Sequence, residues 1–106
     1  MDLHQLTAEM HRFVEAKGWY RSDSPRPQTP RNLAVSISIE AAEILELFQW
    51  AEDIPDLDAL SSELADVTLY LLQLASLSEI DLEKAVLSKL SKNYGRDWEA
   101  DEDSRA

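Results

Sequence analysis

Two long, mostly apolar stretches constrain the fold of this chain more than any other feature. Their spacing predicts one helix from about Thr29 to Ala51 and another from about Leu57 to Leu77. Thr29 is expected to cap the first of these, with Pro30 in the first helical position. Both helices are apolar around most of their circumference, so their own domain or a partner chain must bury them.

Each of these stretches carries a pair of acidic residues three positions apart. Glu40 and Glu43 form the first pair, and Glu63 and Asp66 form the second. Residues at i and i+3 share a helix face, so packing the two helices together would gather four carboxylates. No Lys or Arg occurs between Asn32 and Glu83 to neutralise them. A hard divalent cation with oxygen ligands (magnesium, manganese or calcium) is the simplest remedy, and such a site suggests phosphate chemistry.

The remaining segments also read as helices and their connections. An amphipathic helix is expected over about residues 2–17, capped by Asp2 with Gln5 and stopped by Gly18. A fourth is expected over about residues 82–94, capped by Asp81. The pattern predicts one all-α, four-helix domain over residues 1–98, followed by an acidic tail over 99–106. Its apolar surface exceeds what a monomer of this size can bury, so we expect a homodimer or homotetramer.

Composition excludes several classes of function. The net charge of −11 argues against binding to nucleic-acid polymers or anionic membranes. The absence of cysteine excludes disulfides, thiolate catalysis and zinc–cysteine sites. No apolar stretch is long enough to span a bilayer and no signal peptide is evident, so a cytoplasmic protein is expected. His4 and His11 are read as surface or interface residues, and the lack of a Glu-x-x-His motif argues against a ferritin-type di-iron centre.

The ordered set of motifs resembles the MazG-like, all-α nucleoside triphosphate pyrophosphohydrolases. Glu40-x-x-Glu43 and Glu63-x-x-Asp66 are separated by nineteen residues. The likeness extends toward the dCTP pyrophosphatase branch in four further segments: Pro30-Arg31-Asn32-Leu33, Glu46-Leu47-Phe48-Gln49-Trp50, Tyr70-Leu71, and the stretch from Asp81 to Arg96. This branch carries a histidine just before the Pro-Arg-Asn-Leu stretch, where the present chain has Gln28-Thr29. The loop over residues 20–28 also looks longer than in that branch, so the preferred base stays open.

The resemblance implies a magnesium-dependent enzyme, with manganese as a substitute, in a MazG-like helical bundle that oligomerises. Such an enzyme splits a nucleoside triphosphate into monophosphate and pyrophosphate, here dCTP or a modified pyrimidine dNTP, and so cleans the nucleotide pool. By resemblance the metal ligands are Glu40, Glu43, Glu63 and Asp66. The general base is Glu46 or a member of that quartet. The implied substrate-binding residues are Gln28, Arg31, Trp50, Tyr70, Lys89, Asn93 and Arg96.

Two other functions compete with this one. The first is a nucleotide-binding module that has the fold but no turnover. The second is a structural helical oligomer whose acidic patch binds a basic partner. Either carboxylate pair alone would ordinarily be exposed helix-surface charge. The paired spacing, the apolar surroundings and the missing cations favour the metal site.

Overall fold

The computed structural model describes residues 1–53 and 56–96 and consists there of four helices and no strand. The helices are α1 (Leu3–Ala16), α2 (Pro30–Glu46), α3 (Leu57–Leu77) and α4 (Leu82–Tyr94). The predicted all-α class and the number of helices are therefore confirmed. The expected acidic tail over 99–106 lies outside the described residues.

Side-chain caps set where the helices begin. Asp2 and Gln5 form a reciprocal capping box at α1, as predicted. The Thr29 hydroxyl accepts from the Asn32 amide at α2, and Pro30 occupies the first helical position. Asp56 and Asp81 cap α3 and α4 in the same way. These short-range bonds satisfy amide groups that have no partner inside the helix.

The predicted end of α2 at Ala51 was wrong. The helix ends at Glu46, and the amides of Leu47, Phe48 and Gln49 bond to carbonyls three residues back. This tighter i→i−3 pattern replaces the α-helical one. Residues beyond Glu46 therefore do not continue the helical face that carries Glu40 and Glu43.

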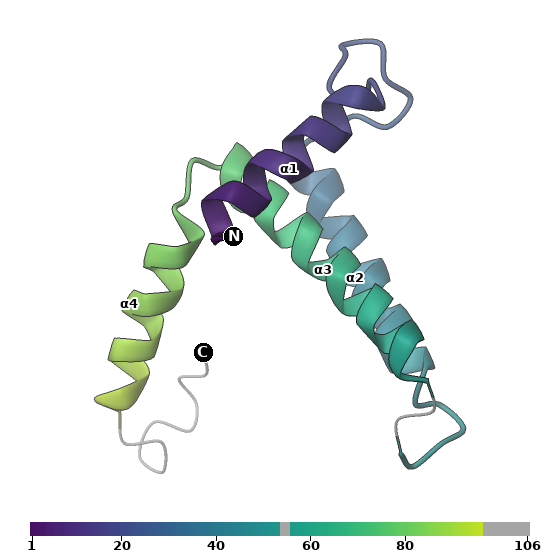
Figure 1. Cartoon of the computed structure of the whole chain (residues 1–106), viewed down its shortest axis with the longest axis vertical. Helices are drawn as coiled ribbons and strands as arrows, with labels where there is room; N and C mark the ends of the chain where they lie inside the picture. The colour runs from purple at the N-terminus through teal and green to yellow at the C-terminus, as the bar shows by residue number, and fades with distance from the viewer. Residues whose placement is uncertain (54–55, 97–106) are drawn as a thin grey trace.

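Three helices form the packed part of the molecule. Helices α2 and α3 lie side by side as a long hairpin, and α1 packs across the end of α3 away from that hairpin's turn (Figure 1). The buried apolar residues come from these three helices: Met10, Val14, Leu33, Leu72 and Ala75. Helix α4 turns away from the end of α3 and makes little contact with it (Figure 1).

Much apolar surface stays exposed in the single chain. On α4 the side chains of Val86, Leu87 and Leu90 are about half exposed or more, and on α2 so are Val35 and Ile39. A surface with this many large apolar side chains is typical of a chain that associates with another. None of the described helices combines the length and apolarity needed to cross a bilayer.

Candidate metal centre and adjoining cavity

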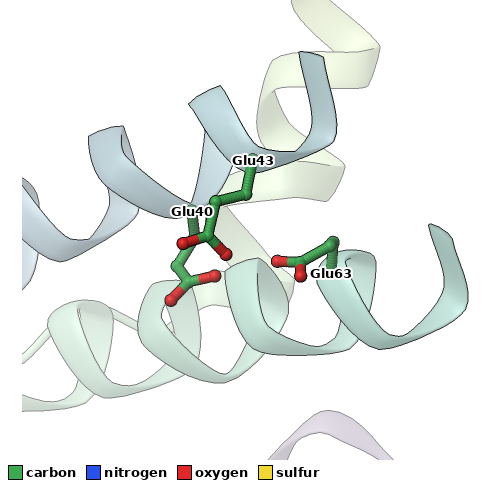
Figure 2. A group of neighbouring side chains, drawn as sticks. All are labelled: Glu40, Glu43 and Glu63. Carbon is green, nitrogen blue, oxygen red and sulfur yellow. The ribbon is translucent and has the colours of Figure 1, made fainter. Parts of the chain in front are cut away.

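Three carboxylates from the hairpin helices converge. Glu40 and Glu43 project from α2 and Glu63 projects from α3, and their carboxylates point toward one another between the helices (Figure 2). One oxygen from each lies within 4.8 Å of the others. All three residues are partly buried. The packing of α2 against α3 thus brings the two sequence motifs together.

The pKa values of this cluster are displaced because like charges lie close in a partly desolvated place. Burial, together with the neighbouring carboxylates of Glu63, Glu43 and Asp66, raises the pKa of Glu40 to about 7. Burial also raises the pKa of Glu63, with Glu43 and Asp66 acting in the same sense. Without a cation, the cluster therefore holds a proton near neutral pH.

The chemistry of the cluster fits a divalent cation. Glu40 Oε2 and Glu63 Oε2 are buried and have no hydrogen-bond partner. Buried polar atoms are normally paired, so two unpartnered carboxylate oxygens in one cluster suit either a shared proton or a bound cation. The ion pairs found among residues 1–53 and 56–96 involve none of the four acids. Oxygen ligands of this kind suit magnesium or manganese.

A cavity of about 690 Å³ adjoins the cluster between α1, α2, α3 and the loop after α1. Glu40 and Asp66 line it, which connects the acidic cluster to the cavity. Asp66 itself lies outside the trio whose oxygens converge within 4.8 Å. The volume is in the range of small-molecule sites, which are commonly several hundred Å³.

Aromatic side chains form part of the cavity wall. Phe13 and Trp19 meet edge to face, with ring centroids 5.6 Å apart. The Arg26 guanidinium lies 5.6 Å from the Trp19 centroid, and Tyr70 lines the wall from α3. Flat aromatic faces beside polar groups can stack on a planar ring such as a nucleobase.

The structure places only some of the other implied site residues at the cavity. Gln28 and Tyr70 line the cavity. Arg31 is exposed in the first turn of α2, and Glu46 is exposed at the end of that helix. Trp50 follows α2 and is 91% exposed, because the helix that would have carried it onto the carboxylate face ends at Glu46.

Lys89 and Asn93 belong to α4, which leaves the hairpin that carries the carboxylate cluster (Figure 1). Lys89 is exposed, and Asn93 is partly buried with an unpartnered Oδ1. Arg96 follows the helix. Their role in substrate binding stays a prediction.

Sequence analysis missed a polar network beside the cavity. It runs from Ser76 through His11 and Tyr20 to Gln73 and Gln28. His11, read from sequence as a surface or interface residue, is partly buried here. Burial raises the pKa of Tyr20, so its hydroxyl stays neutral. The available signal was Gln73 itself, a lone amide between Leu72 and Leu74 in the most apolar helix.

Comparison with known proteins decides the family. Residues 35–105 match the sequence model of the MazG-like family. The chain belongs to the MazG-like family. The predicted resemblance is thereby confirmed.

Curated relatives of this MazG-like chain are dCTP pyrophosphatases. It is 35% identical over 104 residues to dCTP pyrophosphatase 1 of Rattus norvegicus. The alignment covers 90% of this chain and 56% of the relative. It is 36% identical over 104 residues to dCTP pyrophosphatase 1 of Homo sapiens, with 90% and 56% covered. The chain thus spans little more than half the length of these relatives.

A solved structure shares the fold. The crystal structure of a pyrophosphatase from Archaeoglobus fulgidus superposes with a TM-score of 0.72 and 38% identity. The likeness covers 85% of the present chain and 86% of the archaeal one. The helical arrangement of this chain is therefore one that a pyrophosphatase also adopts.

Proposed function

We propose that this protein is a magnesium-dependent nucleoside triphosphate pyrophosphohydrolase. Its reaction would convert a nucleoside triphosphate to the monophosphate and pyrophosphate. A pyrimidine deoxynucleotide, dCTP or a modified form of it, is the proposed substrate because the curated relatives are named dCTP pyrophosphatases. Its proposed role is to remove unwanted nucleotides from the nucleotide pool, and its proposed location is the cytoplasm.

One observation carries the proposal: the acidic cluster and the aromatic cavity are continuous. Glu40 and Asp66 belong to the cavity wall and to the acidic environment around Glu63. A nucleoside triphosphate has two parts of opposite character, a polyanionic chain and a flat base. The cluster suits the first through a cation, and the aromatic wall suits the second.

The residues of the chain would act as follows. Glu40, Glu43, Glu63 and Asp66 would hold magnesium, with manganese as a substitute. Bound there, the metal supplies charge neutralisation at the phosphoryl oxygens and a more acidic water. A carboxylate of the quartet, or Glu46 one turn further along α2, would accept the proton of the water that attacks the α-phosphorus. The broken bond is the α–β phosphoanhydride, and pyrophosphate leaves.

A second copy of the chain would complete the site. Lys89, Asn93 and Arg96 are proposed to approach phosphate or sugar, but in one chain α4 departs from the hairpin (Figure 1). A homodimer or homotetramer would cover the exposed apolar residues of α2 and α4 and could bring a partner's α4 toward the carboxylates.

Product analysis tests the proposal. The protein is incubated with each of the four dNTPs and with 5-substituted dCTP analogues, with magnesium or with a chelator. We expect monophosphate and pyrophosphate in equal amounts, with magnesium only. Diphosphate and phosphate would contradict attack at the α-phosphorus. Absence of turnover with any nucleotide would favour the non-catalytic binding module or the structural oligomer.

Substitution of ligands tests the metal assignment. Glu43→Ala and Asp66→Ala should each reduce kcat by at least 100-fold, because each removes a carboxylate from the metal environment. Both variants should stay helical by circular dichroism. Glu52→Ala, an exposed acid in the connection after α2, is the matched control and should keep full activity. Near wild-type turnover in either ligand variant would refute the assignment.

A further inference from the structure

The wall of the cavity contains an unusual buried amide. Gln73 is 2% exposed and is the only polar side chain buried to this degree within the described residues. Its Nε2 lies 2.8 Å from Gln28 Oε1 and 3.3 Å from the Tyr20 hydroxyl. Both Gln73 and Gln28 line the cavity. An amide kept in an apolar helix at this depth has a cost of desolvation that its hydrogen bonds must offset.

The hydrogen bonds of the network fix the orientation of both glutamine amides. The Arg26 carbonyl can only accept, and it lies 2.7 Å from Gln28 Nε2. The Gln28 Oε1 therefore faces Gln73, and Gln73 must present its N–H groups to that oxygen and to Tyr20.

The hydrogen bonds continue through Tyr20 and His11 to Ser76. Because Tyr20 accepts from Gln73, its own proton is free to donate to His11 Nδ1, 2.6 Å away. In the tautomer that accepts this bond, His11 carries its proton on Nε2, facing the Ser76 hydroxyl at 2.7 Å. Each contact of the network then joins one donor to one acceptor.

This order matters for what the cavity can distinguish. A free glutamine amide can flip and offer either its oxygen or its N–H groups to a ligand, so it does not discriminate between donors and acceptors. The Gln28 amide is bonded to the Arg26 carbonyl and to Gln73, and it cannot flip without losing both hydrogen bonds. One N–H and one lone pair of this amide remain for a ligand, in a fixed order.

We propose that Gln73 is a positioning residue that locks the Gln28 amide, and that this locked amide reads the hydrogen-bonding edge of the nucleobase. The inference rests on the proposed function for the presence of a nucleotide in the cavity. It adds that base selectivity depends on a residue buried in α3. Tyr20 and His11 extend the network across α1 to Ser76, one turn beyond Gln73 on α3.

Equilibrium binding tests this separately from turnover. Dissociation constants are measured by calorimetry, with magnesium, for the non-hydrolysable α,β-imido analogues of the four dNTPs. The readout is the ratio of the weakest to the tightest dissociation constant among the four bases. The variants are Gln73→Met and Gln28→Met, their double variant, and Thr68→Val. Thr68 is an exposed α3 residue whose hydroxyl bonds only within its own helix, so it serves as the matched control.

The wild type should show a clear base preference. Each single glutamine variant should reduce the ratio about 3- to 10-fold, the effect of one net hydrogen bond. The double variant should reduce it no further, because the two residues act as one unit. Thr68→Val should leave the ratio unchanged. If the role of Gln73 is purely structural, Gln73→Met should weaken the binding of all four nucleotide analogues equally and leave the ratio of dissociation constants unchanged.

Several outcomes would overturn the inference. One is a wild-type ratio near one; another is an unchanged ratio in Gln28→Met, the variant that leaves the buried part of α3 intact. A ratio lost in Gln28→Met but kept in a folded Gln73→Met would refute the positioning role. Base-selective binding that depends on both glutamines, without hydrolysis of the natural dNTPs, would refute the proposed function and leave this inference standing. Absence of binding to any nucleotide would overturn both.

Discussion

At the scale of single residues, Glu40 is the group whose protonation links the site to the stability of the protein. Its pKa is about 7 in the folded state against an ordinary value of 4.5. A carboxyl group with a raised pKa stabilises the fold while it is protonated. That stabilisation is present below pH 4.5 and is lost as the pH rises through about 7.

Glu40→Gln should therefore change the pH dependence of stability. In the presence of a chelator, the melting temperature of the wild type should fall between about pH 4.5 and pH 7. The variant keeps a neutral side chain and should show a shallower fall, with higher stability than the wild type above pH 7. Thermal melting followed by circular dichroism measures both, and Glu52→Gln is the control. Parallel curves for Glu40→Gln and wild type would contradict the assignment.

Magnesium should offset the fall in the melting temperature of the wild type with rising pH. A cation competes with the proton for the same oxygens, so its affinity should rise with pH. The increase in melting temperature on adding magnesium should be larger at pH 8 than at pH 5, since a ligand selective for the folded state stabilises it. Glu40→Gln should lose most of that increase at pH 8. An equal increase at both pH values would place the cation elsewhere.

At the scale of elements, the two glycines stand in different backbone conformations. Gly18 has φ +73° just beyond α1, where an L side chain is strained. Gly95 has φ −86° at the end of α4, which any residue adopts. Only the first position therefore requires glycine.

Gly18→Ala should destabilise the fold by about 1 kcal/mol, because alanine is unfavourable in the left-handed region. Gly95→Ala should be nearly neutral, since its Cβ would meet only the Lys92 carbonyl at an ordinary 3.7 Å. Urea denaturation of both variants measures the difference in free energy of unfolding. Equal effects would contradict the conformational argument.

Local sequence predicted the helix starts well and one helix end poorly. The caps at Asp2, Thr29 and Asp81 depend on bonds between residues three positions apart, so their signals are visible in the sequence. The end of α2 at Glu46 has neither glycine nor proline beside it. Nothing local marks the change to the tighter turn.

The site was predictable to a similar extent. The spacing of the two acidic pairs was enough to expect that α2 and α3 would bring carboxylates together, as Glu40, Glu43 and Glu63 do. The polar network was not foreseen because His11 meets Ser76 from 65 positions away, and that contact depends on how α1 crosses α3. Periodicity indicates which face of a helix is apolar, but it does not give the crossing.

At the scale of the whole molecule, α4 is the element that packs least against the rest of the chain. Its Leu87 is 61% exposed, and the helix is attached to the rest of the chain mainly through the end of α3. The rest of the chain does not cover the apolar side chains of α4, and a second copy of the chain could bury them.

Leu87→Glu should shift the protein toward the monomer, because it puts a charge on a surface that association would bury. Light scattering coupled to gel filtration should give the wild type a mass of two or four times 12.0 kDa. Leu87→Glu should move this toward 12.0 kDa. Ser88→Glu, the exposed neighbouring position, is the control and should keep the wild-type mass. A monomeric wild type would contradict the expected oligomer.

Hydrolysis in ¹⁸O-labelled water tests most directly the claim that the carboxylate cluster directs water to the α-phosphorus. The protein, magnesium and dCTP are incubated in labelled water, and both products are analysed by mass spectrometry. We predict one ¹⁸O atom in the monophosphate, none in the pyrophosphate, and at least 100-fold slower label incorporation in Glu43→Ala. Label in the pyrophosphate would mean attack at the β-phosphorus. Label incorporation at a near wild-type rate in Glu43→Ala would mean that the cluster is not the active centre.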